Sequence, residues 1–238
     1  MPEARRFLRY VLPGLLAVLE ALLFLLLAWP AETPQRLLHA TRDLDAGSAL
    51  MAFLVTGALG HALSAVHHTF SWLPVVRGFY AGDYRPFFRR ALGAKLVTTE
   101  PDFSSRNKEP SLSVEEASQA MAALWNESRE CSPHVKAANE RVDSLTDLMH
   151  GAGAASVGAV VAFVVFLFVA WSQAGENCWQ PTTAFALLLA LHVRNYWKLR
   201  EHATRVVEIV FWQELRRREV PPKILLWPEG TSAVRGGS

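Results

Sequence analysis

Residues 152–172 read AGAASVGAVVAFVVFLFVAWS, a run in which no side chain is charged. A helix needs about 20 consecutive apolar residues to cross the hydrocarbon core of a bilayer, so this run predicts a transmembrane helix. Hydrophobic residues make up 51% of the 238-residue chain. Such a composition indicates a membrane protein rather than a set of soluble domains.

Three further runs, residues 11–29, 48–72 and 182–198, have the length and composition of membrane spans. The first follows a basic segment, as a signal peptide does, but its exit lacks a small-residue cleavage site, so we expect it to be retained. The sequence therefore predicts an all-α, polytopic membrane protein with four transmembrane helices.

Basic residues gather in three segments: the N-terminus 1–10, the loop 73–148 between the second and third spans, and residues 199–220 after the fourth. Lys and Arg accumulate in cytoplasmic segments. The outer loop 30–47 holds few basic residues and the outer turn 173–181 holds none. We therefore expect a multi-pass protein with both termini in the cytoplasm, in the inner membrane if the cell is bacterial.

The cytoplasmic loop 73–148 has the pattern of several short helices. Residues 84–96 form a basic amphipathic segment that we expect on the inner membrane surface, and residues 98–112 form a polar, flexible linker. Residues 113–130 and 133–150 repeat apolar side chains at helical spacing. The basic side chains of the amphipathic segment, which we expect to contact anionic lipid, are Arg85, Arg89, Arg90 and Lys95.

The predicted helix 133–150 leads into the third span without a break, and the fourth span continues through residues 199–220. These two long helices match in length, so we expect the third and fourth helices to extend into the cytoplasm as an antiparallel, coiled-coil-like stalk. In that register Asp147 would approach Arg205. The tail 221–238 is expected to be mostly disordered.

Ionisable side chains occur near the middle of three predicted spans: Glu20, His61 and His192. A charged side chain at the bilayer centre costs about 3 kcal/mol and usually has a function. Since the three lie at similar depth, they could meet as a midplane polar cluster and pass protons. The same contact could instead be interhelical hydrogen bonding that fixes the bundle, worth about 1 kcal/mol.

Histidines also recur at two depths, where they could face one another across the bundle. His61 with His192, and His67 or His68 with His150, are possible axial ligands of a b-type haem. No Cys-x-x-Cys-His attachment motif and no zinc spacing is present. We therefore expect no cofactor and no metal site, with haem b as the alternative for which the sequence offers ligands.

No nucleophile elbow or nucleotide-binding loop occurs in the sequence, and the net charge is only +2. The sequence thus favours a non-enzymatic protein without a nucleic-acid partner. The leading hypothesis is a homo-oligomeric membrane scaffold or effector that contacts lipid and binds a cytoplasmic protein through its stalk. The alternatives are a channel or proton pathway lined by the midplane cluster, and a b-type haem protein.

Overall fold

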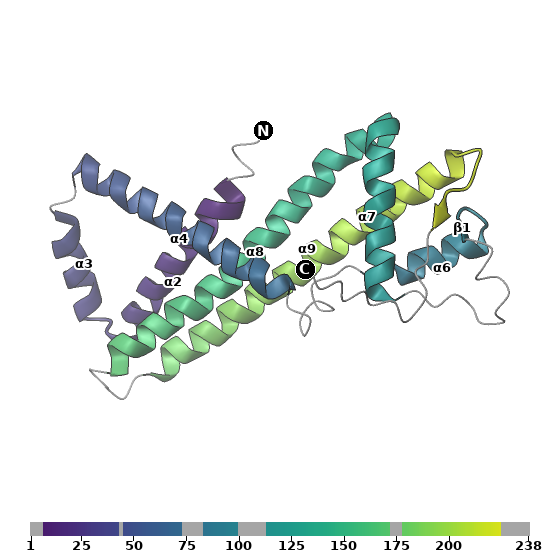
Figure 1. Ribbon diagram of the computed structural model, residues 1–238. Helices are drawn as coiled ribbons and strands as arrows, with labels where there is room; N and C mark the ends of the chain where they lie inside the picture. The colour runs from purple at the N-terminus through teal and green to yellow at the C-terminus, as the bar shows by residue number, and fades with distance from the viewer. Residues whose placement is uncertain (1–6, 43–44, 73–82, 100–112, 172–177, 225–238) are drawn as a thin grey trace, which may run out of the picture. The chain divides into compact units, whose positions relative to one another are not determined.

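The computed structural model describes residues 7–42, 45–72, 83–99, 113–171 and 178–224 (Figure 1). Within these ranges the regular secondary structure is helical apart from two strands of two residues each. The all-α prediction is thereby confirmed. Parts of the predicted N-terminal segment, linker, outer turn and tail lie outside the described residues.

The first half of the chain contains η1 (Phe7–Val11), α2 (Leu12–Ala28), α3 (Glu32–Arg42) and α4 (Ala46–Trp72). The second half contains α6 (Arg85–Gly93), β1 (Thr98–Thr99), α7 (Val114–Cys131), α8 (Pro133–Trp171), α9 (Trp179–Arg217) and β2 (Lys223–Ile224). Of these, η1 is a single π-helical turn, and α3 lies inside the segment that was predicted as an outer loop. Asp45 accepts a hydrogen bond from the Ser48 backbone N–H at 2.7 Å, which caps α4 and lowers the pKa of the Asp45 carboxyl.

Three helices are long and apolar enough to cross a membrane: Arg9–Ala28, Ala46–Phe70 and Pro133–Ala170. The first half of α9, where the fourth span was predicted, is not among them. Its apolar run, residues 184–191, is short and has polar residues on both sides. Length and composition therefore identify three of the four predicted spans.

The chain divides into two compact units, each of which is described by itself. The first unit comprises Met1–Val76 and Ser144–Arg200, and the second comprises Arg77–Asp143 and Glu201–Ser238. Both α8 and α9 contribute to each unit.

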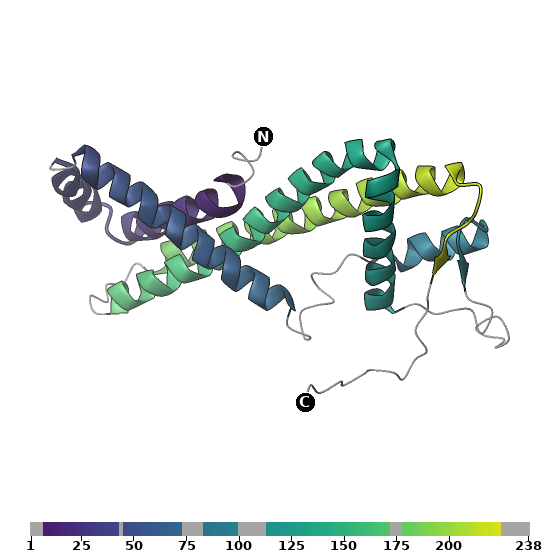
Figure 2. The ribbon, with the colours of Figure 1, turned by 45° about the horizontal axis from the view of Figure 1, so that its top comes forward.

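In the first unit, α2 and α4 cross (Figures 1 and 2), and Gly14 and Gly60 lie at the crossing. A Cβ atom on Gly60 would collide with the carbonyl oxygen of Tyr10, and one on Gly14 would collide with that of Thr56. The two backbones are therefore in direct contact, which only glycine permits. Close approach at small residues is the usual way in which helices associate in an apolar environment.

The third helix of the first unit joins this crossing through another glycine. A Cβ atom on Gly158 of α8 would lie 3.1 Å from the Ala17 Cβ and 3.2 Å from the Leu63 Cδ1. Side chains of α2, α4 and α8 thus meet at one level. Without a side chain at Gly158, all three helices can approach one another.

Four phenylalanines from α2, α8 and α9 form an aromatic layer toward the Trp29 end of the first unit: Phe24, Phe163, Phe166 and Phe185. The rings of Phe163 and Phe185 are stacked, with centroids 4.2 Å apart and an interplanar angle of 5°, and Phe24 meets Phe163 edge-on at 5.7 Å. Such aromatic pairs contribute about 1 kcal/mol beyond the burial of their area. The aromatic layer therefore binds the three helices together.

The second unit buries the apolar face of α6. Phe87 and Phe88 are 1% and 0% exposed, and they belong to a core that includes Phe211 of α9, with Trp212 packed against it. The segment was expected to lie on the inner membrane surface, and this stays a prediction. Because protein side chains cover its apolar face, that face does not contact lipid.

The basic face of α6 remains exposed. Arg85 pairs with Asp83 at 2.8 Å and Arg90 pairs with Glu208 at 3.2 Å. Arg89 and Lys95 are exposed as well. The four basic side chains are thus exposed, and their contact with anionic lipid stays a prediction.

The second unit also contains a small sheet that the sequence did not predict. Thr98 pairs with Lys223 and Thr99 with Ile224 in parallel, and the Thr98 N–H donates to the Pro222 carbonyl at 3.0 Å. These residues were assigned to a flexible linker and a disordered tail, which is wrong for these positions. Their backbone groups pair across the chain, and such pairing leaves little trace in composition.

Within the second unit, α7 lies beside the start of α8 and the last turns of α9 (Figure 2). Polar side chains join these segments. Arg218 donates to Glu127 at 2.9 Å and to the Ser128 hydroxyl at 2.8 Å, and Ser132 donates to Glu214 at 2.8 Å. Ser128 is fully buried. Because charge-assisted hydrogen bonds are stronger than neutral ones, these contacts fix the helix ends in the second unit.

The glycine crossing predicts that Gly60→Ala destabilises the protein. The added methyl group collides with the Tyr10 carbonyl and separates α2 from α4, so the thermal unfolding temperature in detergent should fall by at least 5 °C, the shift expected for about 2 kcal/mol. Gly57→Ala is the matched control, because a Cβ atom at Gly57 meets nothing within 4 Å. Equal unfolding temperatures for the two variants would contradict the crossing.

Candidate functional site

Two ionisable side chains meet inside the first unit. Nε2 of His192 on α9 lies 2.6 Å from Oε1 of Glu20 on α2, and the two side chains are only 12% and 6% exposed. Glu20 faces inward because it follows Ala17 and precedes Phe24 at helical spacing on the buried face of α2. At this distance a proton must lie between the two atoms, so the pair holds a proton on either the imidazole or the carboxyl group.

The second oxygen of Glu20 is not satisfied. Oε2 is buried, and no hydrogen-bond partner for it is found among the described residues. A buried acceptor without a partner costs about 1 to 3 kcal/mol. This oxygen is therefore able to accept a further proton or a water molecule.

His61, the third member of the predicted midplane cluster, is placed elsewhere. It is exposed, and its ring lies 5.2 Å from that of Tyr10. The buried face of α4 instead carries Gly60, Leu63 and His67, which leaves His61 off that face. The structure thus brings together Glu20 and His192, two of the three predicted residues.

A histidine cluster, formed by His67, His68 and His150, lies nearer the Arg9 end of α2. The ring centroids of His68 and His150 are 4.4 Å apart, and His67 lies 5.7 Å from His150 and 5.8 Å from His68. A Cβ atom on Gly153 of α8 would collide with the His67 ring. The absence of a side chain at Gly153 therefore makes room for the histidine cluster.

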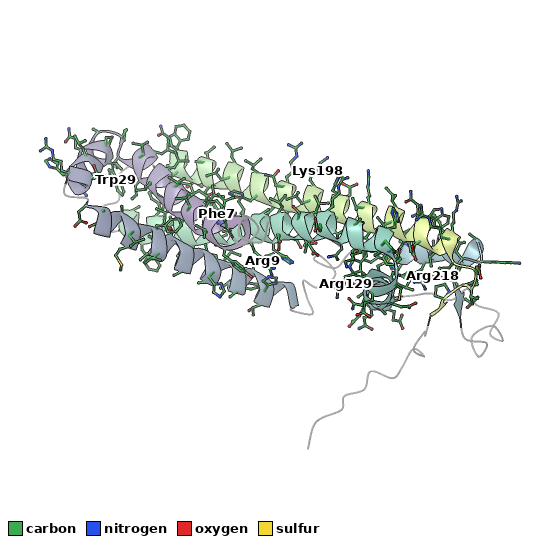
Figure 3. The ribbon with its side chains drawn as sticks, turned by 90° about the horizontal axis from the view of Figure 1, so that it is seen from above. Phe7, Arg9, Trp29, Arg129, Lys198 and Arg218 are labelled. Atoms are coloured by element: carbon green, nitrogen blue, oxygen red, sulfur yellow. The ribbon has the colours of Figure 1, made fainter. Side chains whose placement is uncertain are left out.

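Arg9 also belongs to this site. In the sequence analysis it was only part of the basic segment 1–10, from which the orientation was predicted. Its Nη2 lies 2.7 Å from His68 Nε2, and its Nη1 lies 3.3 Å from Asp147 Oδ1. A guanidinium group can only donate, so Nε2 of His68 accepts and this ring is neutral in the contact. Figure 3 shows Arg9 and Trp29 toward opposite ends of α2.

The stalk register predicted a different partner for Asp147. The structure pairs Asp147 with Arg9, and it pairs Arg205 with Glu201 at 2.6 Å, one helical turn away. The predicted contact between Asp147 and Arg205 is therefore corrected. The position of Arg9 in the sequence could have suggested this pair, since a basic residue at the end of a span can reach along the helix to an acidic partner.

Tyr196 lies between the two groups of titratable side chains. It is 4% exposed, and its ring meets that of His67 edge-on with centroids 5.7 Å apart. On α9 it lies one turn beyond His192, on the same face of the helix. The buried polar residues of the first unit therefore extend from Glu20 to Arg9.

Three of the five candidate haem ligands make other contacts in the structure, and a b-type haem stays a prediction. His192 Nε2 is taken by Glu20, His61 lies on Tyr10, and His68 Nε2 accepts from the Arg9 cation. Among the residues that the structure describes, no group of three or more His, Cys, Asp or Glu side chains could hold a metal ion. An axial histidine must offer a ring nitrogen to the iron, so haem would have to break these contacts.

Comparison with protein-family models, curated proteins and solved structures found no match for this chain. Function is therefore argued from the geometry of the site.

The buried pair predicts coupled effects of Glu20→Leu and His192→Leu on stability. Each single change leaves one buried polar partner unsatisfied and should cost about 1 to 3 kcal/mol in the free energy of unfolding. The double variant removes both polar groups, so its cost should be clearly smaller than the sum of the single costs. Chemical denaturation in detergent measures this cycle, with the exposed His202→Leu as control; strictly additive costs would show that the two side chains do not interact.

Proposed function

We propose that this chain is a four-span membrane protein in which the buried Glu20–His192 pair takes up and releases a proton. The observation that carries the proposal is the 2.6 Å contact between two ionisable side chains inside an apolar bundle. Groups of this kind are expensive in hydrocarbon and mark ion and proton pathways.

The fourth span is supported by the contacts of α9. Phe185 stacks on Phe163 near the Trp29 end, His192 meets Glu20, and Tyr196 meets His67 toward the Arg9 end. These contacts follow one another along the first half of α9. That half thus packs along the same depth of the bundle as α2, although its own apolar run is short.

The proposed topology places the Arg9 end of the bundle at the cytoplasm. The predominance of Lys and Arg in the segments next to this end supports it. Helices α8 and α9 have 39 residues each. We therefore propose that both continue beyond the membrane as an antiparallel stalk that contributes to the second unit.

A Glu–His pair suits proton uptake because it changes its charge in single steps. A neutral imidazole that donates to an ionised Glu20 gives the pair a net charge of −1. One added proton produces either two neutral groups or an ion pair, and in both cases the net charge is zero. A second proton, on Glu20 Oε2 or its equivalent, makes the pair positive. A low-dielectric surrounding makes this step sensitive to every neighbouring charge.

The unsatisfied oxygen favours this function over a purely structural hydrogen bond. Buried polar groups that only hold helices together are normally satisfied, and an orphan acceptor calls for a separate explanation. A homo-oligomeric scaffold with a cytoplasmic protein partner stays a prediction, which the mass of the detergent-solubilised particle can decide.

Infrared difference spectroscopy tests proton uptake. Wild-type protein in bilayers, compared between mildly acidic and mildly alkaline buffer, should show the C=O stretch of a protonated carboxyl group appear and disappear. Glu20→Gln should lose this signal, because Gln has the same shape and cannot be protonated there.

Glu32→Gln is the matched control, since Glu32 is an exposed carboxylate on α3 that pairs with Arg36 at 2.9 Å. This variant should keep the buried-carboxyl signal. A wild-type spectrum in which no band depends on Glu20 would show that the pair does not exchange protons and would refute the proposed function.

A further inference from the structure

We infer that the Glu20–His192 pair exchanges its proton with one end of the bundle only. The route passes Tyr196 and the histidine cluster to Arg9, and the aromatic layer closes the Trp29 end. This inference rests on the proposed function and adds to it the side of access. It makes the protein a proton-responsive switch rather than an open pore.

The part of the bundle between the pair and Trp29 is apolar. From Glu20 toward Trp29, the stretches 21–28, 159–170 and 184–191 contain only apolar residues. Phe24 lies one turn from Glu20 and is 0% exposed, and Phe166 is 1% exposed. A proton needs a chain of hydrogen-bonding groups, and this part of the bundle core offers none.

The Arg9 side of the pair is polar. Tyr196 follows His192 by one helical turn, about 6 Å along the axis, and its ring touches His67. Two buried atoms near this interval, Ser64 Oγ and His150 Nδ1, find no hydrogen-bond partner among the described residues. Unsatisfied buried polar atoms are where single water molecules bind inside proteins.

Side chains from every helix packed around this route are titratable or charged. They are Arg9 and Tyr10 on η1, Glu20 on α2, His67 and His68 on α4, Asp147 and His150 on α8, and Tyr196 and His192 on α9. Opposite charges occur at both ends of the route, with Arg9 beside Asp147 and His192 beside Glu20. The middle of the route consists of groups that are neutral until a proton arrives.

The transfer balances as a sequence of single-proton steps. A proton from solvent binds His68 Nε2, which then stops accepting from Arg9, and the guanidinium keeps its contact with Asp147. The histidine cluster passes the proton to the Tyr196 hydroxyl, which accepts at oxygen and releases its own hydrogen toward His192. The proton ends on the Glu20–His192 pair, and no electron is transferred.

Arg9 is therefore the positioning residue at the mouth of this route. Its guanidinium joins α4 to α8 through His68 and Asp147. A proton on His68 turns the attraction to Arg9 into a repulsion between two cations. Proton uptake is thus coupled to the contact between the two helices.

Proton flux across liposomes tests the closed end. Wild-type protein should conduct hardly more than empty liposomes under a proton gradient. Phe24→Ala should raise the flux by opening the aromatic layer to water, and Phe163→Ala, at a less buried position, serves in case the first variant fails to fold. Adding Glu20→Gln to either variant should abolish the gain.

Phe168→Ala is the matched control, because Phe168 lies on the same helix and is 77% exposed. Its flux should equal that of the wild type. The inference is overturned if the wild type conducts as fast as Phe163→Ala, if opening the aromatic layer changes nothing, or if the gain persists without Glu20.

The rate at which Glu20 takes up a proton after a pH jump tests the proposed access from the Arg9 end of the bundle. Tyr196→Phe should slow the appearance of the infrared signal about a hundredfold, the lower end of what a positioned proton-transfer group contributes. Tyr84→Phe is the control, because Tyr84 packs against the core of the second unit and not along the route. An unchanged rate in Tyr196→Phe would contradict the route through Tyr196. The absence of the Glu20 signal in wild-type protein would instead refute the proposed function itself.

Discussion

The hydrogen bond between His192 and Glu20 is the interaction on which the first unit depends. Neither side chain can face a hydrocarbon environment at low cost, so the carboxyl on α2 and the imidazole on α9 must find each other. Their 2.6 Å contact fixes the rotation and height of both helices. The aromatic layer and the contact of Tyr196 with His67 then follow at the levels that this pairing sets.

The glycines determine how closely the remaining helices can surround the pair. At Gly60 the backbone of α4 touches that of η1, and at Gly153 the backbone of α8 leaves the space that the His67 ring fills. Larger residues at these positions would separate the helices and admit lipid or water between them. The buried polar side chains therefore depend on close helix packing, which keeps lipid and water away from them. The glycines make that packing possible.

Much of the fold could be predicted from the sequence, because hydrophobic runs and helical periodicity are local signals. Counting residues along the predicted spans gave Glu20 and His192 similar depths, and the two side chains do meet. The face on which a residue lies could not be obtained in this way. His61 has nearly the same depth, yet it lies off the buried face of α4, because the glycine crossing sets the rotation of that helix.

Contacts between residues far apart in the chain could not be predicted from the sequence either. Arg9 could be identified as a basic residue at the end of a span, but its contacts with His68 and Asp147 join three separate elements. In the same way, the apolar face of α6 has the pattern of a membrane-surface helix, and only the fold shows that Phe88 packs into a protein core. An amphipathic pattern indicates that a face is covered without indicating by what.

A distance measurement in bilayers tests the central claim most directly. In solid-state NMR, protein labelled with ¹⁵N in histidine and ¹³C in glutamate should show strong dipolar coupling between His192 Nε2 and the Glu20 carboxyl carbon. The signal can be assigned by its loss in Glu20→Gln. The predicted result is a dipolar coupling as large as the short distance in a hydrogen-bonded pair requires. A Glu20 carboxyl that shows no coupling to His192 would contradict the account.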